Sequence, residues 1–447
     1  MTIRWFSSKT VREACALRKH VRRWLSAQRD LLSPMAVGAV TAAMNEVQKA
    51  IVEGANTGKI RIKAEELEFA ANKWLKPYPH AMWRENVEVL LVAIAVAMGI
   101  RTFFLQPFKI PTGSMQPTLY GVQSMPDCSR LTLQVNGGLE DKSKIQAGFD
   151  QQLKLSNDLA IPGGLERFKE WFRGISYVHV VAQNDGPLTG ISPMRRFLIF
   201  NIKQTIWIGG MAHTMWFPPD FGEEPMEYRS GLVLKHLINP ERVYHQGDEL
   251  VKLRVNAGDH LFVDRLTYNF RKPRRGEIVV FETKGIPEER RDYFRIPPNE
   301  FYIKRLVGLG GDTLSLARDY EVSGVPQPDG STANELVGHL VVNGQPLSAS
   351  TPHFENLYSF ADAPAHTNVL VYHENHYYGH AMLPKAQYLT SPGSEFHIRP
   401  DSYCVMGDNT MNSLDSRYWG DFPATCVIGK SFFVYWPITS RFGWGNQ

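Results

Sequence analysis

The sequence predicts a mainly β domain that follows an N-terminal helical region and a single membrane-spanning helix. Three observations support this fold class. Apolar residues in the first 84 positions recur at helical spacing, one long apolar run follows them, and beyond that run the apolar residues alternate in β-branched and aromatic stretches bounded by Gly or Pro.

The composition excludes several other classes of protein. The chain has 447 residues, a formal charge of +4 and 43% hydrophobic residues, which fits several packed domains rather than a bundle of membrane spans, a disordered chain or a fibre. Its four cysteines show no CxxC spacing, so neither a disulfide scaffold nor a structural zinc site is expected.

The N-terminal region, residues 1–86, is basic and helical. Leu17, Val21, Trp24 and Leu25 share one helical face while arginines and lysines crowd the others, which fits either an anionic membrane surface or a helix packed on its neighbour. Ser33-Pro34 starts a second helix with apolar residues three and four apart, and a third helix ends near Trp74.

The most apolar stretch runs from Val87 to Leu105, 19 residues that reach roughly 28 Å as a helix, close to one hydrocarbon thickness. A buried core helix is the alternative, because Arg101 interrupts the run. As a membrane span, the run would keep the basic N-terminal side in the cytoplasm and place residues 106–447 across the membrane.

The outer region, residues 106–447, is expected to be mostly β. Residues 106–119 and 258–447 form the predicted main domain, with strands at Phe108–Thr112, Glu277–Phe281, Phe301–Lys304 and Ser431–Trp436. Residues 120–257 form a predicted inserted subdomain of unknown role, with a helix near Leu165–Phe172 and strands near Tyr177–Ala182 and Arg196–Ile202.

Three segments carry candidate chemistry. Pro111-Thr-Gly-Ser-Met-Gln-Pro-Thr-Leu119 presents Ser114 beside a flexible glycine, but it matches neither GxSxG nor SxxK, and alone it would be a turn. Lys304 lies in an apolar strand, where burial would lower its pKa and leave a neutral amine, although ordinary alternation would point it to solvent. The following Gly308–Gly311 is expected to be a turn, because it lacks the P-loop pattern.

The third segment, Met406-Gly-Asp-Asn-Thr-Met-Asn-Ser-Leu-Asp-Ser-Arg-Tyr-Trp-Gly420, is a polar loop that either carries hydroxyls and carboxylates into a site or forms an Asx-rich turn. Taken together, in this order and behind one anchor, the three segments closely resemble the type I signal peptidases, the membrane proteases that remove secretory signal peptides. The matching stretches are 108–119, 258–314 and 403–437.

The resemblance implies a signal peptidase or LexA-like antiparallel β fold and a Ser/Lys mechanism. It places the nucleophile on Ser114, the general base on Lys304, an oxyanion-binding hydroxyl on Thr112 and a lysine-orienting hydroxyl on Ser413. Asp415 and Arg417 would form a structural pair, and no metal or cofactor is expected. Thr410 departs from the family, since many members carry Arg there.

The resemblance also implies a substrate and a location. A signal peptide would bind as an added strand and be cut after an Ala-x-Ala-like sequence, with pockets walled by Phe108, Ile110, Pro111, Met115, Leu119, Tyr302 and Ile303. The expected partners are signal peptides of exported preproteins, the lipid bilayer and the secretion translocon, with no nucleic acid. The expected location is the inner membrane, as a single-pass protein with its catalytic domain on the periplasmic side.

Three alternatives and one covalent hypothesis accompany this interpretation. His373-Glu-Asn-His376 has the wrong spacing for a zincin helix. A LexA-type repressor would lack the anchor, and a catalytically inactive, membrane-tethered signal-sequence-binding protein is the runner-up. Cys404 and Cys426 flank the third segment and are hypothesised to form a disulfide.

Overall fold

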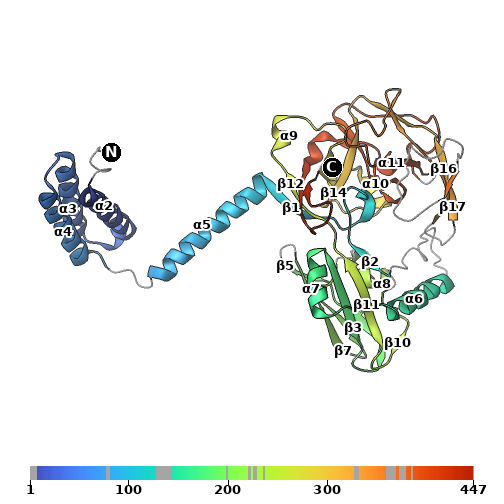
Figure 1. Ribbon diagram of the computed structural model, residues 1–447, viewed down its shortest axis with the longest axis horizontal. Helices are drawn as coiled ribbons and strands as arrows, with labels where there is room; N and C mark the ends of the chain where they lie inside the picture. Colours follow the sequence, from blue (N-terminus) through green and yellow to red (C-terminus); the bar gives the residue numbers. More distant parts are fainter. Residues whose placement is uncertain are drawn as a thin grey trace. The chain divides into compact units, whose positions relative to one another are not determined.

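The computed structural model describes residues 8–76, 81–126, 142–197, 200–219, 223–224, 229–234, 237–326, 332–358, 369–371, 379–383 and 386–445. The chain divides into two compact units, Met1–Ala95 and Val96–Gln447, whose elements are labelled in Figure 1. This division leaves the 120–257 insert in one unit with the main domain, so the boundaries predicted within that unit stay a prediction.

Within residues 8–76, the described start of the N-terminal unit, the α-helices are α2 (Lys9–Gln28), α3 (Pro34–Val52) and α4 (Thr57–Trp74). Ser33 caps α3 through its side chain, with Pro34 at the first turn, as the sequence predicts. The helices share one core that includes Val21, Leu25 and Leu67. The apolar face of α2 is therefore used in packing, which decides between the two interpretations of this helix in favour of a basic helix packed on its neighbours.

Helix α5 (Ala81–Phe103) contains one window, Asn86–Phe103, that is long and apolar enough to cross a membrane, with a mean hydropathy of 1.7. None of that window is buried inside the protein, so α5 is not the core helix that the alternative requires. The helix ends two residues before the predicted limit, because Leu105 already begins strand β1 (Leu105–Lys109).

The main sheet confirms the predicted mainly β fold. Its eight strands lie in the order β1, β12 (His260–Asp264), β25 (Val427–Trp436), β13 (Ile278–Glu282), β14 (Phe301–Leu309), β23 (Ser402–Met406) and β24 (Phe422–Pro423), with β26 (Gly443–Trp444) paired to β25. All its pairs are antiparallel. Two apolar clusters pack on this sheet, one around Leu261 and Val280, the other around Phe281 and Trp419.

Two further four-stranded sheets lie between β14 and β23 in the chain. One contains β15 (Thr313–Leu316), β18 (Leu340–Val342), β19 (Gln345–Pro346) and β22 (Phe396–His397). The other contains β16 (Tyr320–Pro326), β17 (Thr332–Gly338), β20 (Val369–Val371) and β21 (His380–Met382). Of the turn predicted at Gly308–Gly311, only Gly310 and Gly311 form a turn, with Gly311 at a φ of +91°, because Gly308 and Leu309 still belong to β14.

The 120–257 insert is built on two sheets. One consists of β2 (Gln123–Met125), β11 (Glu249–Asn256) and β3 (Ile175–Val181). The other consists of β10 (Val243–Tyr244), β4 (Gly186–Ile191), β6 (Phe200–Ile208), β5 (Arg195–Phe197) and β7 (Met211–Trp216). The insert also contains α6 (Lys142–Asn157), α7 (Gly164–Phe172), α8 (Gly231–Leu234) and the short pair β8 (Glu223–Glu224) and β9 (Arg229–Ser230).

Short helices complete the fold. They are α9 (Thr267–Phe270), α10 (Glu288–Tyr293) and α11 (Ser416–Trp419), with single 3₁₀ turns at η1 (Arg29–Leu31), η2 (Gly113–Met115), η4 (Thr283–Gly285), η6 (Thr410–Asn412) and η7 (Ala424–Cys426). In the insert, the helix predicted near Leu165–Phe172 matches α7, whereas the strand predicted over Arg196–Ile202 is divided between β5 and β6, which pair with each other.

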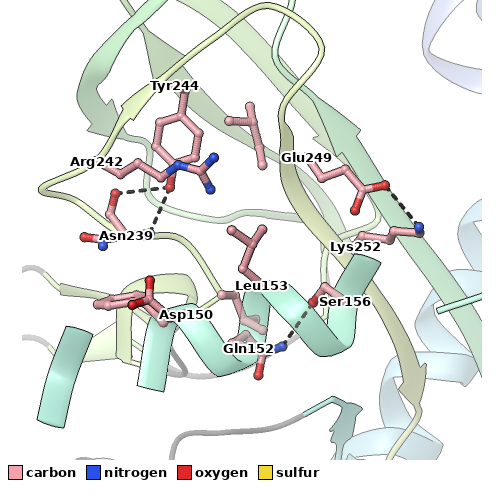
Figure 2. A pocket seen from close by; sticks show the side chains of 12 residues that line it. Asp150, Gln152, Leu153, Ser156, Asn239, Arg242, Tyr244, Glu249 and Lys252 are labelled. Carbon is pink, nitrogen blue, oxygen red and sulfur yellow. Dashed lines mark hydrogen bonds and ion pairs between the residues drawn. The ribbon is translucent and has the colours of Figure 1, made fainter. Parts of the chain in front are cut away.

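A small polar hollow lies in the insert between α6 and the β10–β11 region (Figure 2). Its polar groups pair with one another: the Lys252 ammonium lies 3.0 Å from the Glu249 carboxylate, and the Tyr244 hydroxyl donates to the Asn239 carbonyl at 3.1 Å. These pairs account for the polar side chains there as parts of the fold.

The hypothesis of a Cys404–Cys426 disulfide is wrong, since both thiols are free. Cys404 lies in the core formed with β15 and β18, and Cys426 lies in the core around Phe281 on a different part of the sheet. Flanking the same loop in sequence therefore does not bring the two sulfur atoms together.

Candidate active site

Ser114 lies in η2, the single 3₁₀ turn that follows β1, and is 7% exposed. Its backbone is held by Asn409 of the third motif segment. The Asn409 backbone N–H donates to the Ser114 carbonyl at 3.0 Å, and its side-chain amide donates to the Gly113 carbonyl at 3.1 Å. Two segments almost 300 residues apart are thus bonded together at the candidate nucleophile.

Lys304 lies on β14 and is 5% exposed, so its side chain points into the protein rather than to solvent. Its Nζ lies 2.6 Å from Ser114 Oγ and 3.2 Å from the Ile303 carbonyl oxygen. Burial lowers the pKa of Lys304 from 10.5 to about 8, against the opposing attraction of Asp415 and Asp408. A substantial fraction of this amine is therefore neutral near pH 8 and able to accept a proton.

The Asp415–Arg417 pair is completely buried next to this site. The Arg417 guanidinium donates to both Asp415 oxygens, at 2.9 and 2.8 Å, and to the carbonyls of Ala381 and Thr410, at 2.8 and 2.6 Å. Although burial opposes it, Arg417 holds the pKa of Asp415 below its usual range. Asp415 also accepts the Gly407 backbone N–H at 3.0 Å, so the pair fixes the loop that contacts Ser114.

Gly407 cannot be replaced by a larger residue without movement of this loop. A Cβ atom at this position would lie 2.4 Å from the Ser114 carbonyl oxygen and 2.3 Å from Ser413 Oγ, both far inside van der Waals contact. The glycine therefore allows the third motif segment to pass directly beneath the candidate nucleophile.

Ser413 and Thr112 lie near the dyad but contact it unequally. Thr112 Oγ1 is 3.4 Å from Ser114 Oγ, at the long end of a hydrogen bond. Ser413 Oγ is buried and makes no hydrogen bond of ordinary geometry with the described residues, Lys304 included. Its hydroxyl nevertheless contributes to lowering the pKa of Asp415. The lysine-orienting role of Ser413 stays a prediction.

A second buried ion pair near the site, between Arg305 and Asp408, was not predicted from the sequence. Arg305, next to Lys304, donates to both oxygens of Asp408 at 2.7 and 2.6 Å, and Thr118 donates to the same carboxylate at 2.5 Å. These three residues join the nucleophile segment, β14 and the polar loop. All three residues lie inside the three motif segments, so those segments could have drawn attention to them. A strand arginine next to a lysine, however, gives no indication of which of the two side chains points inward.

Thr410, at the position where many members of the resembled family carry Arg, is buried and bonded to the neighbouring sheet. Its hydroxyl donates to the Gly379 carbonyl at 2.6 Å and accepts the Ala381 backbone N–H at 3.0 Å. Since Ala381 also accepts from Arg417, Thr410 and Arg417 together attach the polar loop to β21.

We predict that Thr410→Val weakens this attachment, because valine keeps the shape but leaves a buried N–H and a buried carbonyl without their partner, at a cost of roughly 1–3 kcal/mol. Hydrogen exchange at the amides of η6 and β21 should rise in Thr410→Val and stay at the parent rate in Thr410→Ser, which keeps the hydroxyl. Equal exchange in both variants would show that the hydroxyl does not hold the loop.

The seven predicted pocket residues differ in burial. Ile110, Met115 and Leu119 are 2%, 0% and 1% exposed within the core cluster that includes Leu261 and Val280. Phe108, Tyr302 and Ile303 are half-buried, and Pro111 is exposed. The Phe108 ring contacts Phe301 edge-on at 5.5 Å, which brings the end of β1 close to the start of β14. His373 and His376 lie outside the described residues.

Fold and site define a mainly β protein in which a serine after an edge strand meets a buried lysine, the two groups that nucleophilic acyl transfer requires. The chain belongs to the signal peptidase family, peptidase S26, whose sequence model matches residues 83–125 and 248–436, just over half of the chain. The resemblance in the three motif segments is thereby confirmed.

Individual relatives agree with this assignment. A signal peptidase I of Leptolyngbya laminosa is 30% identical over 190 residues, which cover 42% of this chain and 64% of the relative. A probable signal peptidase I of Synechocystis is 28% identical, covering 42% and 58% respectively. The chain thus spans about three fifths of the length of these relatives. A solved signal peptidase I of Enterococcus faecalis V583 is 21% identical, covers 36% of this chain and 97% of its own, and has a TM-score of 0.20, too low to carry an argument.

Proposed function

We propose that this protein is a membrane-bound serine endopeptidase that removes N-terminal signal peptides from exported preproteins, with Ser114 as nucleophile and Lys304 as general base. The observation that carries the proposal is the 2.6 Å contact between Ser114 Oγ and a buried Lys304 of lowered pKa, in a chain of the signal peptidase family. The curated relatives support the substrate class, because they carry the name signal peptidase I.

The proposed reaction uses the dyad in both steps. Neutral Lys304 accepts the proton of Ser114 Oγ as this oxygen attacks the scissile carbonyl, and the resulting ammonium donates that proton to the leaving amine, so that an acyl-enzyme remains. Lys304, neutral again, then takes a proton from water, which attacks the ester and releases Ser114. The Ser114 backbone N–H and the Thr112 hydroxyl would bind the oxyanion, donors worth about 3 kcal/mol each at a transition state.

Two strand edges next to the dyad support substrate binding as an added strand. Strand β1 ends the sheet order, with β12 as its neighbour on one side. The Phe104 carbonyl and the Ile110 N–H both bond to the β12 segment, so alternation turns the Pro107 carbonyl to the open side. Pro107 suits an edge strand, because it has no N–H to leave unsatisfied on that side.

The second edge belongs to the first half of β14. This strand pairs with β23 only from Arg305 to Leu309. The carbonyl of Glu300 and the N–H of Leu306 bond on the β13 side, so the backbone groups of Phe301 and Ile303 point the other way. An extended peptide between β1 and the first half of β14 would pair with both edges and bring its scissile carbonyl to Ser114.

The proposed specificity of the site is for substrates with small side chains at the first and third residues before the cut. The half-buried Phe108, Tyr302 and Ile303 would wall the pockets, while Ile110, Met115 and Leu119 form the packed floor behind them. Such a floor leaves little depth, which favours the Ala-x-Ala-like sequence of secretory signals.

The proposed location is the inner membrane, crossed once by α5, with the basic N-terminal unit in the cytoplasm and the catalytic unit on the periplasmic side. Ser114 lies only 11 residues beyond Phe103, the last residue of α5, so an extended path brings the dyad no more than ~40 Å from the end of the span. Cleavage would therefore take place close to the lipid surface, with the secretion translocon as a proposed neighbour.

The decisive experiment compares the detergent-solubilised protein with its Ser114→Ala form on a purified preprotein, followed by mass spectrometry of the new N-terminus. We expect cleavage after an Ala-x-Ala-like sequence by the parent chain and by Ser391→Ala, an exposed control, and none above background by Ser114→Ala. Preprotein that is bound by all three proteins and cut by none would instead identify a catalytically inactive signal-sequence-binding protein.

A further inference from the structure

Helix α7 of the insert presents its apolar face outward. Leu165, Phe168, Trp171 and Phe172 are 42% to 73% exposed, and they fall on one side of the nine-residue helix. Every residue of α7 is exposed except Glu170. An ordinary surface helix buries its apolar side, whereas α7 leaves its apolar side exposed.

Within α7, the polar residue Glu170 faces the protein. Glu170 lies against the hydroxyl of Tyr177 on β3, where burial and the Glu170 carboxylate together raise the pKa of Tyr177. Helix α7 packs on β3 at the outside of the insert (Figure 1). The orientation is therefore fixed by the fold, and the apolar face is left without a partner among the described residues except at its C-terminal end.

At that end α7 joins the main sheet. The Trp171 ring lies 6.2 Å from Trp436 of β25, and the Phe172 carbonyl accepts the Ile438 backbone N–H at 3.1 Å. Trp436 contacts His260 of β12 at 4.8 Å, and the nearby Phe433 contacts Trp444 at 5.5 Å. We call the exposed apolar residues of this region, together with the half-buried Trp436 that Trp171 contacts, the aromatic face: Leu165, Phe168, Trp171, Phe172, Trp436, Ile438, Phe442 and Trp444.

The aromatic face lies close in the fold to the end of the candidate membrane span. Helix α5 ends at Phe103, β1 begins at Leu105, β1 pairs with β12, and β12 pairs with β25 at Trp436. Two strand spacings across the sheet and four residues along it amount to roughly 16 Å. A bilayer crossed by α5 would therefore border this part of the catalytic unit.

We propose that α7 is an interfacial helix whose apolar face enters the outer leaflet, so that the 120–257 insert is a second membrane contact of the catalytic unit. Exposed Trp and Phe beside Arg167, Lys169 and Arg173 are the composition of a helix that lies in the headgroup region of a bilayer. The inference rests on the proposed membrane attachment of this peptidase. It assigns a role to a segment for which the sequence offers none.

Photocrosslinking of the full chain tests this contact without relying on catalysis. Phe168 and Glu166 are both exposed and lie on opposite sides of α7, so each is replaced in turn by benzoylphenylalanine, and the protein is reconstituted into vesicles of phosphatidylethanolamine and phosphatidylglycerol. We expect lipid adducts, identified by mass spectrometry, at position 168 and at least tenfold fewer at position 166. Equal yields at the two positions, or adducts at 168 to a second copy of the chain, would overturn the proposal.

A cleavage assay separates this inference from the proposed function. The variant Phe168→Gln should cut a short soluble signal-peptide substrate at the parent rate and cut a preprotein embedded in vesicles several-fold more slowly, since Phe168 does not touch the dyad. If Phe168→Gln cut both substrates at the parent rate, the proposed role of α7 would be contradicted. If the parent chain cuts neither substrate while the variant with benzoylphenylalanine at position 168 still forms lipid adducts, the peptidase function is rejected and the interfacial helix is kept.

Discussion

Cleavage by this protein should increase about tenfold per pH unit below pH 8 and level off above it. Burial lowers the pKa of Lys304 to about 8, and only the neutral amine can accept the Ser114 proton. Activity therefore rises with pH, because raising the pH through that pKa converts the inactive ammonium into the base. The profile of kcat/KM from pH 6 to 10 on a peptide substrate measures this ionisation in the free enzyme.

The same reasoning predicts that Lys304→Arg is inactive, with a loss of at least 10³-fold, because a guanidinium keeps its proton throughout this range. Lys430→Arg is the matched control, since Lys430 lies beside Glu277 on β25, which β13 separates from β14. A profile that is flat from pH 6 to 10, or substantial turnover by Lys304→Arg, would remove Lys304 from the role of base.

The part of the site that could be predicted from sequence is the part that lies in short, unusual segments. Ser114, Lys304 and Asp415 each stand in a motif that alone also allows a purely structural role, and only the three motifs together indicate a site. The mainly β fold follows from alternating runs such as Phe301–Lys304. The pair of Arg305 and Asp408 was not predicted, although both residues lie in those motifs. Side chains alternate between the two faces of a strand, so Lys304 and Arg305 point to opposite faces of β14. Both faces are buried here, so alternation alone does not show that both residues are inside.

The errors in the sequence-based predictions come from contacts that local pattern does not contain. Cys404 and Cys426 flank one loop, but the strands that carry them contribute to different cores. The face of α2 had two interpretations because amphipathic spacing describes a helix equally well on a lipid surface and in a bundle. Only packing against α3 and α4 decides between them. The insert gave no functional signal, since its feature, an outward apolar face on α7, depends on which side of the helix meets β3.

The second large effect is expected at the Asp415–Arg417 pair. Asp415→Asn leaves the Arg417 charge completely buried without its counter-charge, which typically costs 3–5 kcal/mol. The cost should appear locally, because the pair fixes Gly407 and Thr410 of the loop beside Ser114. Hydrogen exchange at the amides of β23 and of residues 407–417 in the detergent-solubilised full chain should report opening that is easier by about that amount. Cleavage should fall with it.

A double variant distinguishes the charge from the positioning that it provides. Asp415→Leu with Arg417→Met removes both buried charges and keeps similar volume, so exchange protection should recover most of its loss. Cleavage should stay low, since neither new side chain can accept the Gly407 N–H or donate to the Ala381 and Thr410 carbonyls. The exposed pair Arg61–Glu65 serves as control, where Glu65→Gln should change neither property.

Because Arg417 holds the pKa of Asp415 below its usual range, the stability that the pair contributes is present at neutral pH and is lost as the pH falls through that lowered pKa. The stabilities of the parent and the double variant should therefore converge in acid. Parent-like cleavage by the double variant would show that the pair stabilises the fold without positioning the site.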